Sequence, residues 1–197
     1  MRNYIHQGNL SFKDKVFSLD YLLIFLILLL GIISFFAMYS TESGNFGYYT
    51  KSHIYRFCVF FTIFFVISFF KIQFWHKSSY LFYLVVLILL FAVDYFGVTA
   101  SGSKRWINLF VFNLQPSELM KVALIIFLAR YYNKIPSHEA NHFRYILIPI
   151  FALLIPVSLI ITQPDLGTAV LVGIGGIAVI WMVGFKMKYF IYSTMIL

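Results

Sequence analysis

The sequence predicts an all-α integral membrane protein, a polytopic helical bundle with six complete transmembrane helices and the start of a seventh. Its 197 residues are 61% hydrophobic and 11% charged, with a mean hydropathy of +0.88, whereas soluble domains carry roughly 25% charged residues. Apolar runs of about 20 residues cross a bilayer as helices, because in hydrocarbon the backbone can satisfy its hydrogen bonds only internally.

Each predicted span is one such apolar run. The third run carries Asp94 near its far end, and the fourth begins at a proline, which suits the first turn of a helix. The six runs are Tyr21–Tyr39, Ile54–Phe70, Tyr80–Val98, Pro116–Tyr132, Tyr145–Thr162 and Gly167–Phe185. Another apolar segment begins at Met187 and stops at Leu197, about half the length that a span needs. We therefore expect the C-terminus to be truncated.

The distribution of Lys and Arg between the spans predicts the orientation, because cytoplasmic loops are enriched in these residues. With the N-terminus inside, ten of them lie on the cytoplasmic side and five on the outer side. Residues 1–20 are then a cytoplasmic segment and residues 21–197 a transmembrane domain. The excess of cytoplasmic Lys and Arg, which anionic lipids attract, accounts for the net charge of +8. We therefore expect no nucleic-acid partner.

Charged residues at the start of the fourth span form the first candidate site. Glu118 lies where the positive end of the helix dipole favours a carboxylate, and Lys121 follows at the i, i+3 spacing that allows the two to pair. Two interpretations stay open, a helix cap with a lysine that snorkels to the interface and a polar cavity that faces outward. Arg105, beside Trp106 in the preceding outer loop, suits the membrane interface and contact with a phosphate.

A second polar cluster, TQPDLGT, lies between the fifth and sixth spans and contains Gln163 and Asp165. One interpretation is a simple turn in which Asp165 caps the sixth helix. However, Gln115 before the fourth span is also followed by a proline and then an acid, and both junctions border the same compartment. The repetition favours one outward-facing site built from both junctions.

The segment HEANH, which starts at His138, fits the H-E-x-x-H pattern of zinc proteases. It lies in a short predicted cytoplasmic loop, and the next acid along the chain, Asp165, is predicted to lie across the membrane. Because a third ligand is missing, we interpret the segment as a solvated loop and predict no metal site. No cofactor is evident from the sequence, and a divalent cation is left open.

Four segments in order, AVDYFGV, GSKRWINL, QPSELMK followed by LARYY, and QPDLGTAVLV, resemble the shape, elongation, division and sporulation (SEDS) family, especially its RodA branch. The resemblance covers the whole chain. It implies that the chain is the N-terminal part of a larger, roughly ten-helix bundle in the bacterial inner membrane. Members polymerise lipid II, an undecaprenyl-pyrophosphate-linked disaccharide, into glycan strands for cell elongation or division. They act with a class B penicillin-binding protein and other membrane proteins of the elongation complex.

The resemblance also implies roles for the polar residues. The pyrophosphate of lipid II needs cations, which Arg105 and Lys121 supply. The other cavity candidates in the matching motifs are Gln115, Glu118, Gln163 and Asp165. The family's proposed catalytic aspartate lies in an outer loop after helix seven and is expected beyond Leu197, so no catalytic residue is assigned here, and we expect this chain alone to be inactive.

Two other functions stay open at the level of the sequence: a transporter (flippase) of lipid-linked precursors, and a noncatalytic membrane component of the elongation or division complex. A transporter should also carry paired intramembrane charges that are reached from the cytoplasm. The six predicted spans hold few such charges besides Asp94, which favours the polymerase.

Overall fold

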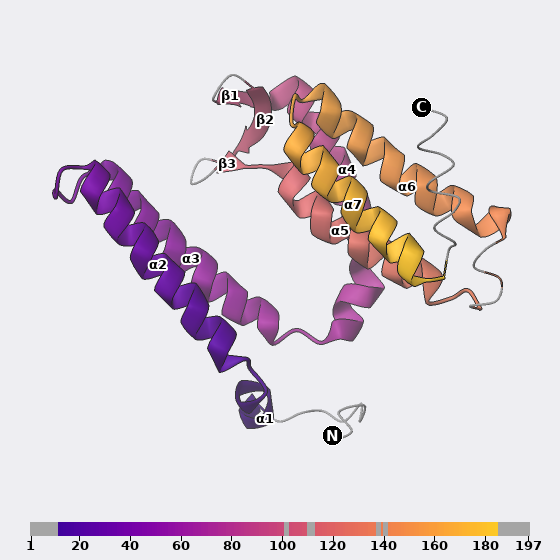
Figure 1. Ribbon diagram of the computed structural model, residues 1–197, viewed down its shortest axis with the longest axis horizontal. Coiled ribbons are helices and arrows are strands. Elements are labelled where there is room, and N and C mark those ends of the chain that lie inside the picture. The colour runs from indigo at the N-terminus through magenta and orange to yellow at the C-terminus, as the bar shows by residue number, and fades with distance from the viewer. Residues whose placement is uncertain (1–11, 101–102, 110–112, 137–138, 140–141, 185–197) are drawn as a thin grey trace. The chain divides into compact units, whose positions relative to one another are not determined.

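The computed structural model describes residues 12–100, 103–109, 113–136, 139 and 142–184. Within these ranges the chain forms seven helices and three short strands (Figure 1). It divides into two compact units, Met1–Phe70 and Lys71–Leu197.

The first unit consists of the short helix α1 (Phe12–Phe17) and a hairpin of two long helices, α2 (Tyr21–Thr41) and α3 (Tyr48–Ser68). The side chain of Asp20 begins α2 by accepting a hydrogen bond from the Leu23 amide at 3.0 Å, which satisfies one of the donors left free at a helix start. At the other end of α2, the Glu42 carboxylate accepts hydrogen bonds from the Tyr49 and Thr50 amides of α3 at 3.0 and 2.9 Å. The carboxylate thereby joins the two helices at their turn.

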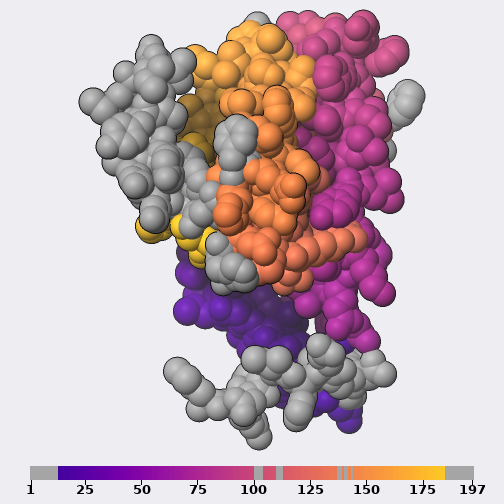
Figure 2. Space-filling view, turned by 90° about the vertical axis from the view of Figure 1, so that its right-hand side faces the viewer, coloured from indigo at the N-terminus to yellow at the C-terminus, as the bar shows by residue number. Residues whose placement is uncertain are grey.

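The second unit is a bundle of α4 (Ile72–Phe96), α5 (Pro116–Tyr132), α6 (Phe143–Thr162) and α7 (Leu166–Met182). Helix α5 packs against each of the other three. Its buried apolar side chains, Met120, Ala123, Leu124 and Leu128, recur at the spacing of one helix face. Figure 2 shows α6 in orange beside α4 in magenta on one side of this unit.

A hydrogen bond between α4 and α6 repairs a defect in α6. Pro156 lies inside α6 and has no amide hydrogen, so the carbonyl of Ala152, four residues earlier, loses its helical donor. The hydroxyl of Tyr83, on α4, donates to that carbonyl at 2.8 Å. The proline is therefore tolerated in an apolar interior because a neighbouring helix supplies the missing donor.

Helices α6 and α7 are in close contact at Gly176. A Cβ atom there would lie 2.6 Å from Leu153 Cδ1 and 3.1 Å from Leu124 Cδ2, whereas one on Gly173 would meet nothing within 4 Å. Gly176 lies on the face that Ala169 and Val172 bury, which explains the difference.

The described part of the chain is all-helical apart from the predicted outer loop between α4 and α5, which contains three short strands that were not predicted. Strands β1 (Val98–Ala100), β2 (Ser103–Asn108) and β3 (Asn113–Leu114) form a small antiparallel sheet in that order. In this sheet Val98 pairs with Trp106, and Ile107 pairs with Leu114. A connection at a helix end must satisfy its backbone groups, and short antiparallel pairing does so without a further helix.

All six predicted helical segments are present in the predicted order as α2 to α7. Among the described residues, four helical segments are long and apolar enough to cross a membrane, namely Tyr21–Thr41, Tyr48–Ser68, Ile72–Phe96 and Arg144–Thr162. Helix α7 is a shorter apolar helix, and α5 has 17 residues with charges in its first and last turns. The count of six spans stays a prediction, and the predicted start of a seventh at Met187 lies outside the described residues.

Candidate functional site

Polar side chains from three elements meet at one end of the second unit, where the strands lie beside the starts of α5 and α7 (Figure 1). Arg105 lies on β2, Gln115 is the N-cap residue of α5, and Asp165 is the N-cap residue of α7. The two Gln-Pro-acid junctions begin helices that run in the same direction, so their polar residues gather at the same end. The structure brings together one residue from each junction, Gln115 and Asp165.

Asp165 is the centre of this cluster. Its side chain is 9% exposed. Its Oδ2 accepts a hydrogen bond from Gln115 Nε2 at 2.7 Å, and its Oδ1 accepts one from the Thr168 amide at 3.4 Å. Its Oδ1 also lies 3.5 Å from a terminal guanidinium nitrogen of Arg105. A carboxylate held by donors on both oxygens is suited to fixing its neighbours in place, and it is a poor candidate for a free general base.

Arg105 is the cation of the cluster. Its side chain is 27% exposed, so one part faces Asp165 and another part reaches the surface. Its Nε is buried and makes no hydrogen bond within the part of the chain that the structure describes. A guanidinium has five donors, and the Asp165 contact uses few of them. Arg105 can therefore bind a further anion while Asp165 holds it in position.

Glu118 and Lys121 form a second and more exposed ion pair, with 2.7 Å between Lys121 Nζ and Glu118 Oε2. Their side chains are 53% and 30% exposed. The i, i+3 pairing predicted from the sequence is confirmed. No hydrogen bond or ion pair among the described residues joins this pair to Asp165. The Glu118–Lys121 pair is therefore a separate ion pair on α5 and not a member of the Asp165 cluster.

Gln163 has a structural role on the α4 side. It is 3% exposed and donates to the Leu90 carbonyl at 3.0 Å, with Asp94 Oδ1 at 3.4 Å from the same nitrogen. Lys104 Nζ donates to the Asp94 carbonyl at 2.6 Å near the end of α4. Gln163 therefore ties α6 to α4 within the bundle, and its side chain is too buried to meet a substrate from outside.

Sequence reasoning missed Ser117 and Thr168, which complete the cluster. Ser117 Oγ accepts a hydrogen bond from Gln115 Nε2 at 3.1 Å, and the Thr168 amide donates to Asp165. Both residues are buried in the first turn of a helix. Their position two or three residues after each N-cap is the signal that would have found them.

The HEANH segment lies partly outside the described residues, since His138, Ala140 and Asn141 have no described placement. Among the residues with a described placement, no group of three or more His, Cys, Asp or Glu side chains could hold a metal ion. The zinc-protease interpretation and the question of a divalent cation are therefore untested by the structure.

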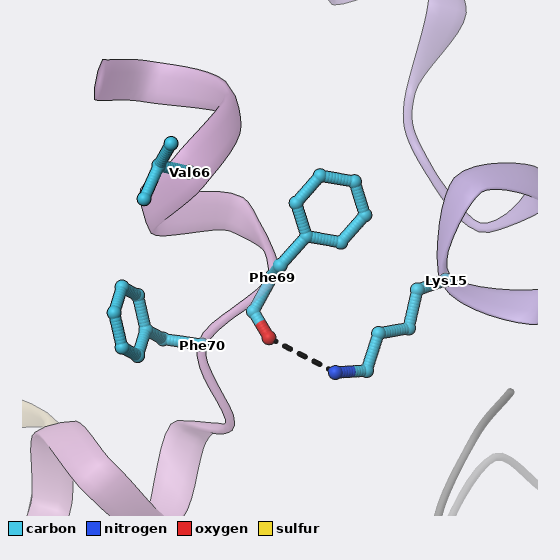
Figure 3. A pocket seen from close by; sticks show the side chains of 4 residues that line it. All are labelled: Lys15, Val66, Phe69 and Phe70. Atoms are coloured by element: carbon cyan, nitrogen blue, oxygen red, sulfur yellow. Dashed lines mark hydrogen bonds between the residues drawn. The ribbon is translucent and has the colours of Figure 1, made fainter. Parts of the chain in front are cut away.

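A pocket in the first unit contains none of the predicted site residues. It has a volume of about 420 Å³ and is lined by Lys15, Val66, Phe69 and Phe70 (Figure 3). The ammonium of Lys15 donates to the Phe69 carbonyl at 3.1 Å, at the C-terminal end of α3. This contact is typical of a lysine that caps a helix C-terminus. The polar chemistry lies in the Asp165 cluster, so we do not assign the pocket a role in the candidate site.

Comparison with protein families gives a match over nearly the whole chain. Residues 17–197 match the family model of FtsW, RodA and SpoVE, which is described as cell cycle protein. A probable peptidoglycan glycosyltransferase FtsW of Buchnera aphidicola subsp. Schizaphis graminum is 29% identical over 143 residues, which make up 73% of this chain and 40% of the relative. The peptidoglycan glycosyltransferase MrdB of Escherichia coli K12 is 36% identical over 109 residues, 54% of this chain and 28% of the relative. The chain thus spans less than half the length of either relative.

Solved structures share the fold. The rod shape determining protein RodA of Thermus thermophilus aligns with a TM-score of 0.76 and 24% identity over 89% of this chain and 57% of that chain. A chain from a peptidoglycan synthase complex, described as coordinating polymerization and crosslinking, aligns with a TM-score of 0.78 and 24% identity over 90% of this chain and 52% of that chain. At this level of identity the likeness concerns the fold alone.

Proposed function

Because the chain belongs to the FtsW, RodA and SpoVE family of multi-pass helical membrane proteins, we propose that it is the N-terminal part of a RodA-like peptidoglycan glycosyltransferase. The substrate in this proposal is lipid II, which the whole protein polymerises into glycan strands for cell elongation and rod shape. Both curated relatives named above are called peptidoglycan glycosyltransferases, one of them as probable. Since this chain spans only part of each, the proposal for the chain itself is a binding role.

One observation carries the proposal: Arg105, Gln115 and Asp165 converge where α5 and α7 begin. The start of each helix carries a partial positive charge of roughly half an elementary unit, which attracts anions. A pyrophosphate on a lipid tail needs cations at the membrane surface beside an apolar path for the tail. The end of a helix bundle that presents a guanidinium and two helix starts meets the first of these needs.

In this proposal each residue has a distinct role. Arg105 binds the pyrophosphate through the donors that Asp165 leaves free, and Asp165 and Gln115 are positioning residues that hold Arg105 and the two helix starts together. Lys121 is a second cation, which Glu118 neutralises when the substrate is absent. No residue of this chain has the role of general base in the proposal, because the family's proposed catalytic aspartate is expected beyond Leu197.

The membrane arrangement in the proposal has six spans in the bacterial plasma membrane, with the N-terminus in the cytoplasm and the Asp165 cluster outside. The polar cluster at one end of the bundle and the basic residues near its other end, such as Arg130 and Lys134, support this orientation. Residues 1–20 are then a cytoplasmic segment. The partner is a class B penicillin-binding protein, a proposal supported by the fold shared with a chain of a peptidoglycan synthase complex.

The test is binding of undecaprenyl pyrophosphate to the purified chain in lipid nanodiscs, with uncharged undecaprenol as the reference ligand. We expect Arg105→Gln to weaken binding of the pyrophosphate by about tenfold or more, because a hydrogen bond to a charged group contributes roughly 1.5–3 kcal/mol. The matched control is Arg56→Gln, which removes an arginine whose described hydrogen bonds go to Ser52. Equal binding of the two lipids by the wild-type chain would contradict the proposal.

A further inference from the structure

Three basic residues lie at the end of the second unit where α4 begins and α5 ends, the end opposite to the Asp165 cluster. They are Lys77 in the second turn of α4, Arg130 in the last turn of α5, and Lys134 just beyond α5. Arg130 donates from a terminal nitrogen to the Lys77 carbonyl, which brings the two helices together. Its guanidinium carbon lies 4.3 Å from the centre of the Tyr80 ring, and Lys134 Nζ lies 6.0 Å from the same ring centre.

This basic cluster has no carboxylate partner within the described part of the chain. The ion pairs there are Arg105–Asp165 and Lys121–Glu118, and neither includes a residue of the basic cluster. The Nε of Arg130 is buried and makes no hydrogen bond to any described residue. Two cations beside one aromatic ring repel each other, and the partial positive charge at the start of α4 is offset by the partial negative charge at the end of α5. An anion that binds here would relieve the repulsion.

The surface next to the basic cluster is apolar and follows one face of α4. Leu81, Leu84, Val85 and Ile88 are exposed, and they lie four, seven, eight and eleven residues after Lys77, on the same side of the helix. A headgroup at Lys77 would therefore have its acyl chains along an exposed hydrocarbon stripe. Tyr80, with an apolar ring and a polar hydroxyl, is typical of the boundary between these two regions. Free phosphate would use the charges but leave the stripe without a role.

We propose that Lys77, Arg130 and Lys134 form a binding site for the phosphodiester headgroup of an anionic phospholipid, with its acyl chains along the exposed face of α4. The site is separate from the Asp165 cluster and does not depend on the proposed glycosyltransferase function. Basic pockets between membrane helices bind such headgroups in other proteins. The anionic lipid would hold α4 and α5 together at this end of the bundle.

The test measures binding of phosphatidylglycerol to the full chain in detergent by native mass spectrometry, with phosphatidylcholine as the zwitterionic reference. The double variant Lys77→Gln/Lys134→Gln should weaken phosphatidylglycerol binding by roughly thirtyfold, which corresponds to about 1 kcal/mol for each basic residue. The charge-matched control, Lys13→Gln/Lys51→Gln, removes two exposed lysines of the first unit and should change binding by less than about threefold.

Two further measurements distinguish lipid binding at this site from binding through bulk charge or through phosphate alone. Lys77→Arg/Lys134→Arg keeps both charges and should keep wild-type binding, and a loss of binding in this variant would contradict the proposal. Inorganic phosphate at millimolar concentration should not displace the lipid, since it gains nothing from the apolar stripe. Equal losses in the glutamine double variant and in its charge-matched control would assign the binding to bulk charge and overturn the proposal. Displacement of the lipid by phosphate would overturn the lipid assignment.

Discussion

Gln115 and Asp165, fifty residues apart in the chain, are joined by a 2.7 Å hydrogen bond from the Gln115 amide nitrogen to the Asp165 carboxylate. Each residue is the N-cap of a helix, α5 in one case and α7 in the other. The bond therefore fixes the start of one helix relative to the start of the other. Because Asp165 also holds Arg105, the position of the proposed anion-binding guanidinium depends on the packing of these two helices.

The first prediction concerns the buried side of this cluster. Asp165→Asn removes the negative charge that faces Arg105 and should lower the free energy of unfolding by about 1–3 kcal/mol, since a partly buried guanidinium then lacks its counter-ion. Thermal unfolding of the purified chain in detergent measures the loss. Glu118→Gln is the control, because an exposed i, i+3 pair contributes less than about 0.5 kcal/mol. Similar losses in both variants would show that the burial of Asp165 has no energetic consequence.

The second prediction concerns the hydrogen bond that replaces the one lost at Pro156. Tyr83→Phe leaves the Ala152 carbonyl without a donor and should lower the free energy of unfolding by about 1 kcal/mol. Pro156→Ala restores an amide hydrogen to the helix, so Tyr83→Phe should have almost no effect in that background. A double-mutant cycle of unfolding free energies measures this coupling. A Tyr83→Phe effect of the same size in both backgrounds would argue against this role of Tyr83.

The third prediction concerns the close contact between α6 and α7. Gly176→Val places methyl groups against Leu153 and Leu124 and should destabilise the second unit by about 1–3 kcal/mol through overpacking. Gly173→Ala is the matched control, since open space surrounds that position, and it should leave the stability unchanged or raise it by up to about 1 kcal/mol. Unfolding in detergent reports both, and a tolerated Gly176→Val would mean that the helices are less closely packed there.

The fourth prediction is a pH dependence at the turn between α2 and α3. The pKa of the Glu42 carboxyl is lowered from its ordinary value of 4.5, by the neighbouring Thr50 hydroxyl and by the amides of Thr50, Tyr49 and Gly47, against the opposing effect of desolvation. Thr50 Oγ1 makes no hydrogen bond to any described residue. We therefore attribute the lowered pKa of Glu42 mainly to the backbone amides. A lowered folded-state pKa means that the stabilisation is present above the unfolded pKa and is lost as the pH falls through the folded pKa.

The measurement is the difference in melting temperature between the wild-type chain and Glu42→Gln. We expect the wild type to be the more stable at about pH 6 and the difference to shrink as the pH falls below about 4. Gly47→Ala should also lower the melting temperature at neutral pH, because the new Cβ would displace the Glu42 carboxylate from the amides. A melting-temperature difference that does not change with pH would show that the charge of Glu42 does not stabilise the turn.

The fifth prediction is the membrane orientation. In a Cys58→Ala background, which removes the single native thiol, a cysteine at Asn113 should react with an impermeant thiol reagent added outside intact cells. A cysteine at Asn133 should react only after the membrane is opened. Both positions are exposed and lie near opposite ends of α5. The reverse pattern of labelling would place the Asp165 cluster in the cytoplasm and exclude the proposed glycosyltransferase site.

Features fixed by local geometry could be predicted from the sequence. The six helical segments follow from apolar runs, and the Glu118–Lys121 pair follows from the i, i+3 spacing on one helix. Helix geometry alone places such side chains together, so no knowledge of packing is needed. The strands around Trp106 were missed although the Ser101-Gly102 pair is a turn signal. Because the segments on either side of these strands are highly apolar, helices joined by loops were the natural expectation.

Contacts between elements could not be predicted in the same way. The Arg105–Asp165 ion pair depends on how β2 and α7 pack, and the two residues are separated by sixty positions. The contact of Gln163 with Leu90 similarly depends on how α6 is placed beside α4. The repeated Gln-Pro-acid pattern predicted that the two junctions share one end of the bundle, but not that a single hydrogen bond joins them. Such contacts follow from interhelical packing, which the sequence specifies only through many residues together.

Helices α5 and α2 differ in how much of their surface neighbouring protein buries. Seven residues of α5 are buried by neighbouring protein, whereas no residue of α2 is buried. With 21 residues, α2 is about 31 Å long, close to the hydrocarbon thickness of a typical bilayer. Hydrophobic mismatch between this length and the surrounding bilayer therefore acts directly on α2, through its tilt and depth, while α5 is shielded from it by its protein neighbours.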